Sequence, residues 1–154
     1  MNVGDQISRV PLTLTGNEQQ TLDNYRGQWI VLYFYPKDAT PGCTLEGQQF
    51  RDHYAEFTAL NTTVLGVSRD SLKSHENFKA KQQFPFDLIS DSTEQLCEQF
   101  DVIKMKSMYG KQVRGIERST FIIDPHGKIQ AIWRKVKVPG HVEEVLAKLK
   151  SLKN

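Results

Sequence analysis

One cysteine stands where the sequence pattern favours a reactive thiolate. Cys43 follows Thr40-Pro41-Gly42, and a threonine before a proline is typical of a helix start, with Thr40 at the N-cap and Pro41 at the first helical position. The first turn of a helix has unpaired N–H groups and lies at the positive end of the helix dipole, and both features stabilise an anion. We therefore predict that Cys43 is a nucleophile rather than a cysteine buried as a small hydrophobic residue.

The segment before this turn predicts the element that positions the thiol. Residues 29–35, WIVLYFY, form an apolar, β-branched and aromatic run that is too short to span a membrane. Such a run is typical of a strand buried on both faces. Pro36 ends the strand because it has no N–H to donate.

The rest of the chain alternates strand and helix patterns. Expected strands cover residues 62–70, 86–91, 118–124 and 128–135, with an edge segment at 8–14. Expected helices cover residues 43–60, 71–84, 92–102 (with Ser92 at the N-cap) and 139–152, whereas 103–115 is expected to be a loop. This order predicts one α/β domain over residues 1–154, in which helices flank both faces of a central mixed β-sheet.

Composition narrows the function classes. The chain has 154 residues, 38% hydrophobic and 25% charged, and a formal net charge of +2, which argues against a nucleic-acid-binding or membrane protein. The basic residues near the end of the chain alternate with apolar ones and are interpreted as a solvated face. No signal peptide or transmembrane run is recognisable, and two cysteines cannot form a disulfide scaffold, so we expect a cytoplasmic protein.

No metal or cofactor site is expected. The four histidines His53, His75, His126 and His141 are scattered without ligand spacing and are interpreted as surface residues. The sequence has no HExxH, CxxC or glycine-rich nucleotide motif, and the missing CxxC argues against a dithiol reductase.

The segment around Cys43 resembles a known family. PKDATPGC fits the peroxiredoxin signature Pro-x-x-x-Thr-x-x-Cys, and the longer FYPKDATPGCTLEG resembles the bacterial bacterioferritin comigratory protein, or Q, subfamily. The similarity extends through VLGVSRD, LISD and STFIIDPHGKI in the same order. The resemblance implies a thioredoxin-like fold and a cofactor-free, thiol-dependent peroxidase that acts in antioxidant defence on hydrogen peroxide and organic hydroperoxides.

The resemblance also implies roles for four residues. Cys43 corresponds to the peroxidatic cysteine, which becomes a sulfenic acid, and Thr40 to the threonine that hydrogen-bonds the thiolate or the peroxide. Pro36 corresponds to the proline that shields the site and Arg118 to the active-site arginine. From the residues alone, Thr40 could serve only as an N-cap, Pro36 only as a strand terminator and Arg118 only as a surface charge.

The sequence departs from the subfamily at the resolving position. Many members carry a second cysteine five residues after the first, where this chain has Gln48. The other thiol, Cys97, is either a buried helical cysteine or a resolving residue that reaches Cys43 after local unfolding. If Cys97 does not resolve, the enzyme is of the one-cysteine type and needs an external thiol such as glutathione, glutaredoxin or thioredoxin. The subfamily resemblance favours a monomer or a weak dimer.

Two alternatives to a peroxidase remain open. The chain could be a redox sensor in which oxidation of Cys43 changes a partner interface, or a related domain that has lost activity. Because Thr40, Cys43 and Arg118 are all present, the sequence favours the enzyme, since a sensor needs only the thiol.

Overall fold

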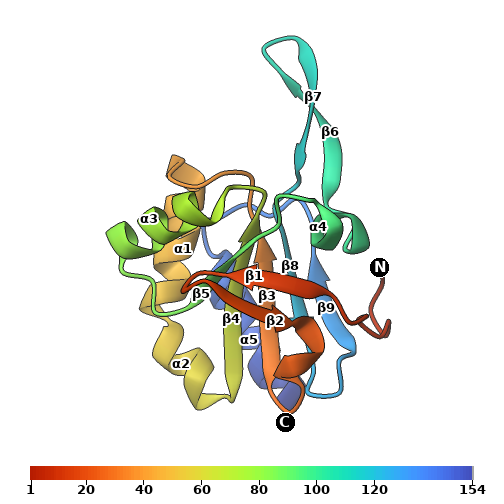
Figure 1. The fold of residues 1–154 in the computed structure, drawn as a ribbon. Coiled ribbons are helices and arrows are strands. Elements are labelled where there is room, and N and C mark those ends of the chain that lie inside the picture. Colours follow the sequence, from red (N-terminus) through yellow and green to blue (C-terminus); the bar gives the residue numbers. More distant parts are fainter. Residues whose placement is uncertain (154) are drawn as a thin grey trace.

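The structure, a computed structural model, describes residues 1–153, which form two β-sheets and the helices around the larger one (Figure 1). The larger sheet has seven strands in the order β2-β1-β5-β4-β3-β8-β9 within these residues. Its strands are β1 (Pro11–Leu14), β2 (Glu18–Thr21), β3 (Trp29–Phe34), β4 (Thr62–Ser68), β5 (Asp87–Ser90), β8 (Ser119–Ile123) and β9 (Ile129–Trp133). The helices are η1 (Leu22–Tyr25), α1 (Pro41–Asp52), α2 (Tyr54–Ala59), α3 (Leu72–Gln82), α4 (Gln95–Gln99) and α5 (His141–Lys153).

The strand that leads to Cys43 lies inside this sheet. β3 runs parallel to β4 on one side and antiparallel to β8 on the other, so the sheet is mixed, as the sequence predicts. Residues of β3 from Ile30 to Phe34 are all buried, which fits a strand covered on both faces. The amide of Tyr35 still bonds the Val67 carbonyl at 3.0 Å, and the pairing ends before Pro36.

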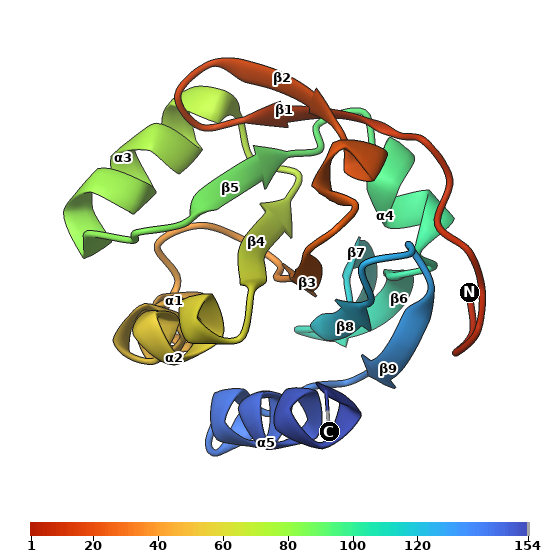
Figure 2. The ribbon, with the colours of Figure 1, turned by 90° about the horizontal axis from the view of Figure 1, so that it is seen from below.

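Alternate residues of β3 enter two separate apolar clusters, one on each face of the sheet. Ile30, Leu32 and Phe34 belong to the cluster that α4 and the N-terminal segment cover. Val31 and Tyr33 belong to the cluster that α1, α2, α3 and α5 cover. Figure 2 shows α5, α1 and α2 beneath one face and α4 on the other side. The predicted inward positions of α5, Val142, Val145, Leu146 and Leu149, are all buried.

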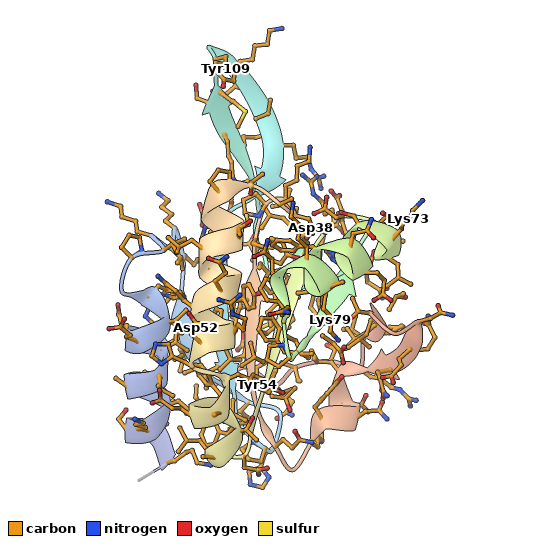
Figure 3. The ribbon with its side chains drawn as sticks, turned by 90° about the vertical axis from the view of Figure 1, so that its left-hand side faces the viewer. Asp38, Asp52, Tyr54, Lys73, Lys79 and Tyr109 are labelled. Carbon is orange, nitrogen blue, oxygen red and sulfur yellow. The ribbon has the colours of Figure 1, made fainter. Side chains whose placement is uncertain are left out.

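The expected loop at 103–115 is wrong, because this segment forms a β-hairpin. β6 (Ile103–Met108) pairs antiparallel with β7 (Lys111–Ile116) and projects beyond the large sheet (Figures 1 and 3). Tyr109 and Gly110 at its tip have φ values of 53° and 77°, the left-handed pair that a tight hairpin turn requires. Most of the hairpin is exposed, so it lacks the apolar alternation by which a half-buried strand is recognised.

Three further expectations about boundaries are corrected. The segment at 8–14 is not an edge, since β2 pairs on the outer side of β1. The helix predicted to run to residue 60 is interrupted at His53, whose φ of −100° and ψ of 6° separate α1 from α2. Ser92 is not the N-cap of α4; that position belongs to Glu94, and the Asp91 carboxylate accepts hydrogen bonds from the backbone of the first turn instead. Within residues 1–153, no helix combines the length and the apolar character needed to cross a membrane.

Candidate active site

Cys43 lies in the first turn of α1, at the end of β3 from which the chain leaves the sheet. Its side chain packs in the same apolar cluster as Tyr33 and Tyr35, and the residue is 2% exposed. Pro41 occupies the first turn as predicted, and Thr40 is at the N-cap with an extended φ of −80° and ψ of 155°. The predicted strand-to-helix junction is therefore confirmed, and it places the sulfur at the positive end of the helix dipole.

The hydroxyl of Thr40 does not cap the helix, contrary to the prediction. Oγ1 donates to the Lys37 carbonyl at 2.8 Å and accepts no hydrogen bond from the first turn of α1. This hydrogen bond links the two ends of the turn from Lys37 to Thr40. Since the described residues provide no side-chain cap there, the N–H groups of this turn stay available to a bound anion.

Arg118, between β7 and β8, reaches the sulfur of Cys43. Its Nη2 lies 3.4 Å from Cys43 Sγ and its Nη1 lies 2.6 Å from Glu46 Oε1. Burial opposes the charge of the guanidinium, but Glu46 and Cys43 face it and raise the pKa of Arg118 above its usual value. Arg118 is therefore a permanently charged donor beside the thiol and not a solvated surface residue.

Glu46 is a component of this site that the sequence analysis missed. It follows Cys43 by three residues in α1, so both side chains lie on the same face of the helix. Its side chain is fully buried, and among residues 1–153 no group donates to Oε2. Burial raises the pKa of Glu46 to about 7, although the charge and hydrogen bond of Arg118 lower it. The i, i+3 spacing was the available signal in the sequence.

A second cation, in the middle of the first strand of the hairpin, lies near this trio. Lys106 in β6 donates to the carbonyl of Ile116. Burial and the charge of Arg118 lower the pKa of Lys106, whereas Cys43 acts in the opposite direction. The hairpin thus contributes positive charge to the surroundings of the thiol.

Comparison with known proteins agrees with this geometry. The AhpC/TSA family model matches residues 3–132. Peroxiredoxin Bcp of Xanthomonas campestris is 58% identical over 142 residues, covering 92% of this chain and 89% of the relative. Peroxiredoxin Bcp of Bacillus subtilis is 50% identical over 143 residues, covering 92% of this chain and 91% of the relative.

The chain belongs to the AhpC/TSA family and is a peroxiredoxin. The crystal structure of a Xylella fastidiosa PrxQ mutant is similar with a TM-score of 0.96 at 55% identity, covering 100% of this chain and 98% of that one. The structure of the bacterioferritin comigratory protein of Xanthomonas campestris gives 0.91 at 53% identity, covering 97% and 100%. The thioredoxin-like fold and the resemblance to the Q subfamily are confirmed, and the protein is a thiol-dependent peroxidase.

The two thiols of this peroxiredoxin lie on opposite faces of the sheet. Both are free and buried, but Cys43 belongs to the cluster containing Val31 and Tyr33, whereas Cys97 belongs to the cluster containing Ile30. Burial and the neighbouring Asp91 carboxylate raise the pKa of Cys97 well above its usual value, so it stays protonated.

Pro36 and Gln48 lie on either side of the thiol along the chain. Pro36 is half-buried in the turn between β3 and α1, and the structure gives its ring no polar role. Gln48, at the resolving position of many subfamily members, donates from Nε2 to Gln82 Oε1 in α3 at 2.9 Å. That position therefore links two helices in this peroxiredoxin.

The interpretation of all four histidines as surface residues is wrong for two of them. His75 and His141 are buried, at 0% and 4% exposure. The ring of His141 contacts Thr120 Oγ1 through Nε2 at 2.8 Å, and burial lowers its pKa to about 4. His126 is exposed, and His53, partly exposed, contacts Glu56 at 2.9 Å.

A cavity of about 400 Å³ lies between the loop before α1 and α3. It is bounded by residues 37–39 of the loop and by α3, and Cys43 is not among its lining residues.

Proposed function

We propose that this peroxiredoxin reduces hydrogen peroxide and organic hydroperoxides through a sulfenic acid on Cys43. The observation that carries the proposal is the Arg118 guanidinium, placed 3.4 Å from Cys43 Sγ in a first turn without a side-chain cap among the described residues. The Xanthomonas campestris bacterioferritin comigratory protein, 53% identical, is described by its alkyl peroxide reduction activity, which supports organic hydroperoxides as substrates.

In the first step the thiolate of Cys43 attacks one oxygen of the hydroperoxide. The S–O bond forms as the O–O bond breaks, and the departing oxygen takes a proton and leaves as water or an alcohol. Negative charge moves from sulfur to that oxygen, so donors that face both atoms stabilise the transition state. The Arg118 guanidinium and the N–H groups at the start of α1 are such donors.

Thr40 and Pro36 complete the proposed site. Because the proton of Thr40 Oγ1 points to the Lys37 carbonyl, the oxygen keeps its lone pairs and can accept the O–H of a hydroperoxide. We propose that the Thr40 hydroxyl orients the substrate. Pro36 lies at the end of the buried strand, and we propose that its ring keeps water away from the reacting atoms.

We propose a one-cysteine cycle. An external thiol attacks the sulfenic sulfur, forming a mixed disulfide and releasing water, and a second thiol then regenerates Cys43 and leaves as a disulfide. Cys97 lies across the sheet and Gln48 cannot supply a thiol, which supports this cycle over an internal disulfide. Glutathione, glutaredoxin or thioredoxin would be the reductant, and the dependence on a thiol pool fits the cytoplasm.

Turnover tests the proposal against a redox sensor. With excess dithiothreitol and hydrogen peroxide, the wild-type enzyme should consume many equivalents of peroxide, and Cys43→Ser none. Consumption that stops after one equivalent would instead support a sensor.

A further inference from the structure

A buried hydrogen-bonded pair joins the loop that leads into α1 to helix α3. Asp38 in the loop and His75 in α3 have side chains that are 4% and 0% exposed, and His75 Nδ1 lies 2.7 Å from Asp38 Oδ2. The other ring nitrogen, Nε2, lies 2.8 Å from the carbonyl oxygen of Ile89 in β5. Since both ring nitrogens face oxygen acceptors, Nε2 carries a proton and a second proton lies between Nδ1 and the carboxylate. His75 thereby ties the loop to the sheet.

Other donors converge on the same carboxylate. The hydroxyl of Tyr35 donates to Asp38 Oδ1 at 2.6 Å, and Ser74 Oγ donates to Oδ2 at 2.8 Å. The backbone N–H of Asp38 in turn donates to Asp70 Oδ2 at 2.9 Å, an oxygen that also accepts from Ser68 Oγ at 2.6 Å. Figure 3 shows Asp38 beside α3, at the end of the molecule from which the hairpin rises. The loop is thus anchored through its side chain and its backbone.

The anchored residue is next to a strained one. Ala39 separates Asp38 from Thr40 and has a φ of 62°, a left-handed conformation that alanine disfavours. Thr40 then closes the loop on the Lys37 carbonyl. Alanine favours other backbone conformations, and the hydrogen bonds of the adjacent Asp38 are contacts that can hold this one. Thr40 and the start of α1 follow directly after it.

We propose that His75, acting through Asp38, is a positioning residue for peroxide reduction. It contacts neither sulfur nor substrate; it holds the loop so that Thr40 and the first turn of α1 face the hydroperoxide together. The inference rests on the proposed function, since it takes Cys43 and Thr40 as the reacting site. Apolar side chains could stabilise this part of the core, whereas a hydrogen-bonded pair fixes one conformation of the loop.

Two reactions of Cys43 separate positioning from stability. Reaction with hydrogen peroxide needs Thr40 and Arg118 in place, whereas alkylation by iodoacetamide needs only an accessible thiolate. In His75→Gln the bond to Asp38 is lost, so we expect the second-order rate constant with peroxide to fall at least tenfold while the alkylation rate does not fall. His75→Asn places its amide N–H near the position of Nδ1 and should recover most of the peroxide rate.

Ser71→Ala is the matched control. The Ser71 hydroxyl caps α3 by accepting from the Ser74 N–H at 3.1 Å, so its loss weakens the same helix without removing a partner of Asp38. Both rates should stay within twofold of the wild type. If His75→Gln does not fold, Tyr35→Phe, which removes one donor to Asp38, should still lower the peroxide rate threefold or more.

Several results would overturn the positioning role. These are a folded His75→Gln variant that reacts with peroxide within twofold of the wild type, an equal loss of both rates, or no recovery in His75→Asn. Cys43→Ser, measured alongside, tests the underlying function separately. If that variant kept the wild-type peroxide rate, the proposed function would fall; if it were inert and His75→Gln reacted normally, only the positioning role would.

Discussion

Arg118 donates a guanidinium N–H to the sulfur of Cys43 across 3.4 Å, although the two residues are 75 positions apart in the chain. The other terminal nitrogen of the guanidinium, Nη1, donates to Glu46 Oε1 at 2.6 Å. Glu46 therefore holds the guanidinium by a contact that does not involve the sulfur. This relationship makes Arg118 the donor that our account depends on most.

Removing the guanidinium should slow the reaction with peroxide strongly. Arg118→Ala deletes a preorganised charged donor, and losses of about 10²- to 10³-fold are usual for such a donor. Arg118→Lys keeps the charge but has one nitrogen in place of the two that contact the sulfur and Glu46, so its rate should be intermediate. Stopped-flow measurement of the second-order rate constant checks both variants. An Arg118→Ala enzyme as fast as the wild type would remove this residue from the site.

Replacing Glu46 by glutamine should change how stability depends on pH. In the folded protein burial raises the pKa of Glu46 from 4.5 to about 7, although Arg118 opposes this. The folded state therefore binds the proton more tightly than the unfolded state, and stability falls as the carboxyl ionises. Relative to Glu46→Gln, the free energy of unfolding of the wild type should fall by up to about 3 kcal/mol as the pH rises from 4.5 to 7.

Urea unfolding of both proteins between pH 4.5 and pH 7 measures this difference. His141 titrates in the opposite sense, because burial lowers its pKa to about 4 and stability rises as pH increases towards its usual 6.5. That contribution is the same in both proteins and cancels in the comparison. A difference that stays constant with pH would show that Glu46 does not titrate as described.

Alanine substitutions at two glycines of α1 should affect the peroxide rate and the stability separately. A Cβ at Gly42 would lie 3.2 Å from Arg118 Nη2, so Gly42→Ala should displace the guanidinium by a few tenths of an ångström. We expect a peroxide rate about tenfold lower, with stability unchanged or up to about 1 kcal/mol higher because alanine favours the helix. The rate and the urea midpoint are measured on the same preparation.

Gly47→Ala is the converse control. A Cβ there would overlap Phe84 Cζ and lie 2.9 Å from Phe84 Cε1, inside a packed aromatic cluster. Such overpacking should cost about 1–3 kcal/mol of stability, while the peroxide rate of the folded protein stays near that of the wild type. If the stability loss fell on Gly42→Ala and the rate loss on Gly47→Ala, the packing around α1 would differ from the one described.

A cysteine at position 48, where many subfamily members carry the resolving thiol, should change the proposed one-cysteine cycle into one with an internal disulfide. Five residues rise about 7.5 Å along a helix, beyond the Cα separation of about 7 Å that a disulfide allows. In Gln48→Cys we therefore expect the first turns of α1 to unwind after oxidation and a disulfide to Cys43 to form. Intact mass after one equivalent of peroxide should show the loss of two hydrogens, and Gln48→Ser should behave as the wild type. A persistent sulfenic acid in Gln48→Cys would mean that α1 does not open.

The sequence predicted the parts of this peroxiredoxin whose residues have a periodic, buried pattern. The strand at 29–35, the helix start at Pro41 and the apolar face of α5 were all recognisable because burial selects regular spacing. The hairpin at Ile103–Ile116 was not, since an exposed two-stranded element has no buried face to set a period.

The buried polar partners were also beyond the sequence. Glu46 and His75 are buried because groups far along the chain pair with them, Arg118 in one case and Asp38 in the other. A single polar residue on a helix is more often exposed, and only the fold brings these partners together. Thr40 and Arg118 could therefore be predicted to lie near Cys43 by resemblance, whereas Glu46 and the contacts that hold these residues could not.

The most direct test of our account follows the fate of the two thiols. Reduced wild type, Cys43→Ser and Cys97→Ser are each treated with one equivalent of hydrogen peroxide in the presence of dimedone, which traps sulfenic acids, and their intact masses are measured. We predict one dimedone adduct on wild type and on Cys97→Ser, and none on Cys43→Ser. Loss of two hydrogens from the wild type without an adduct would place a disulfide between Cys43 and Cys97 and contradict the one-cysteine cycle. An adduct on Cys43→Ser would contradict the assignment of the nucleophile itself.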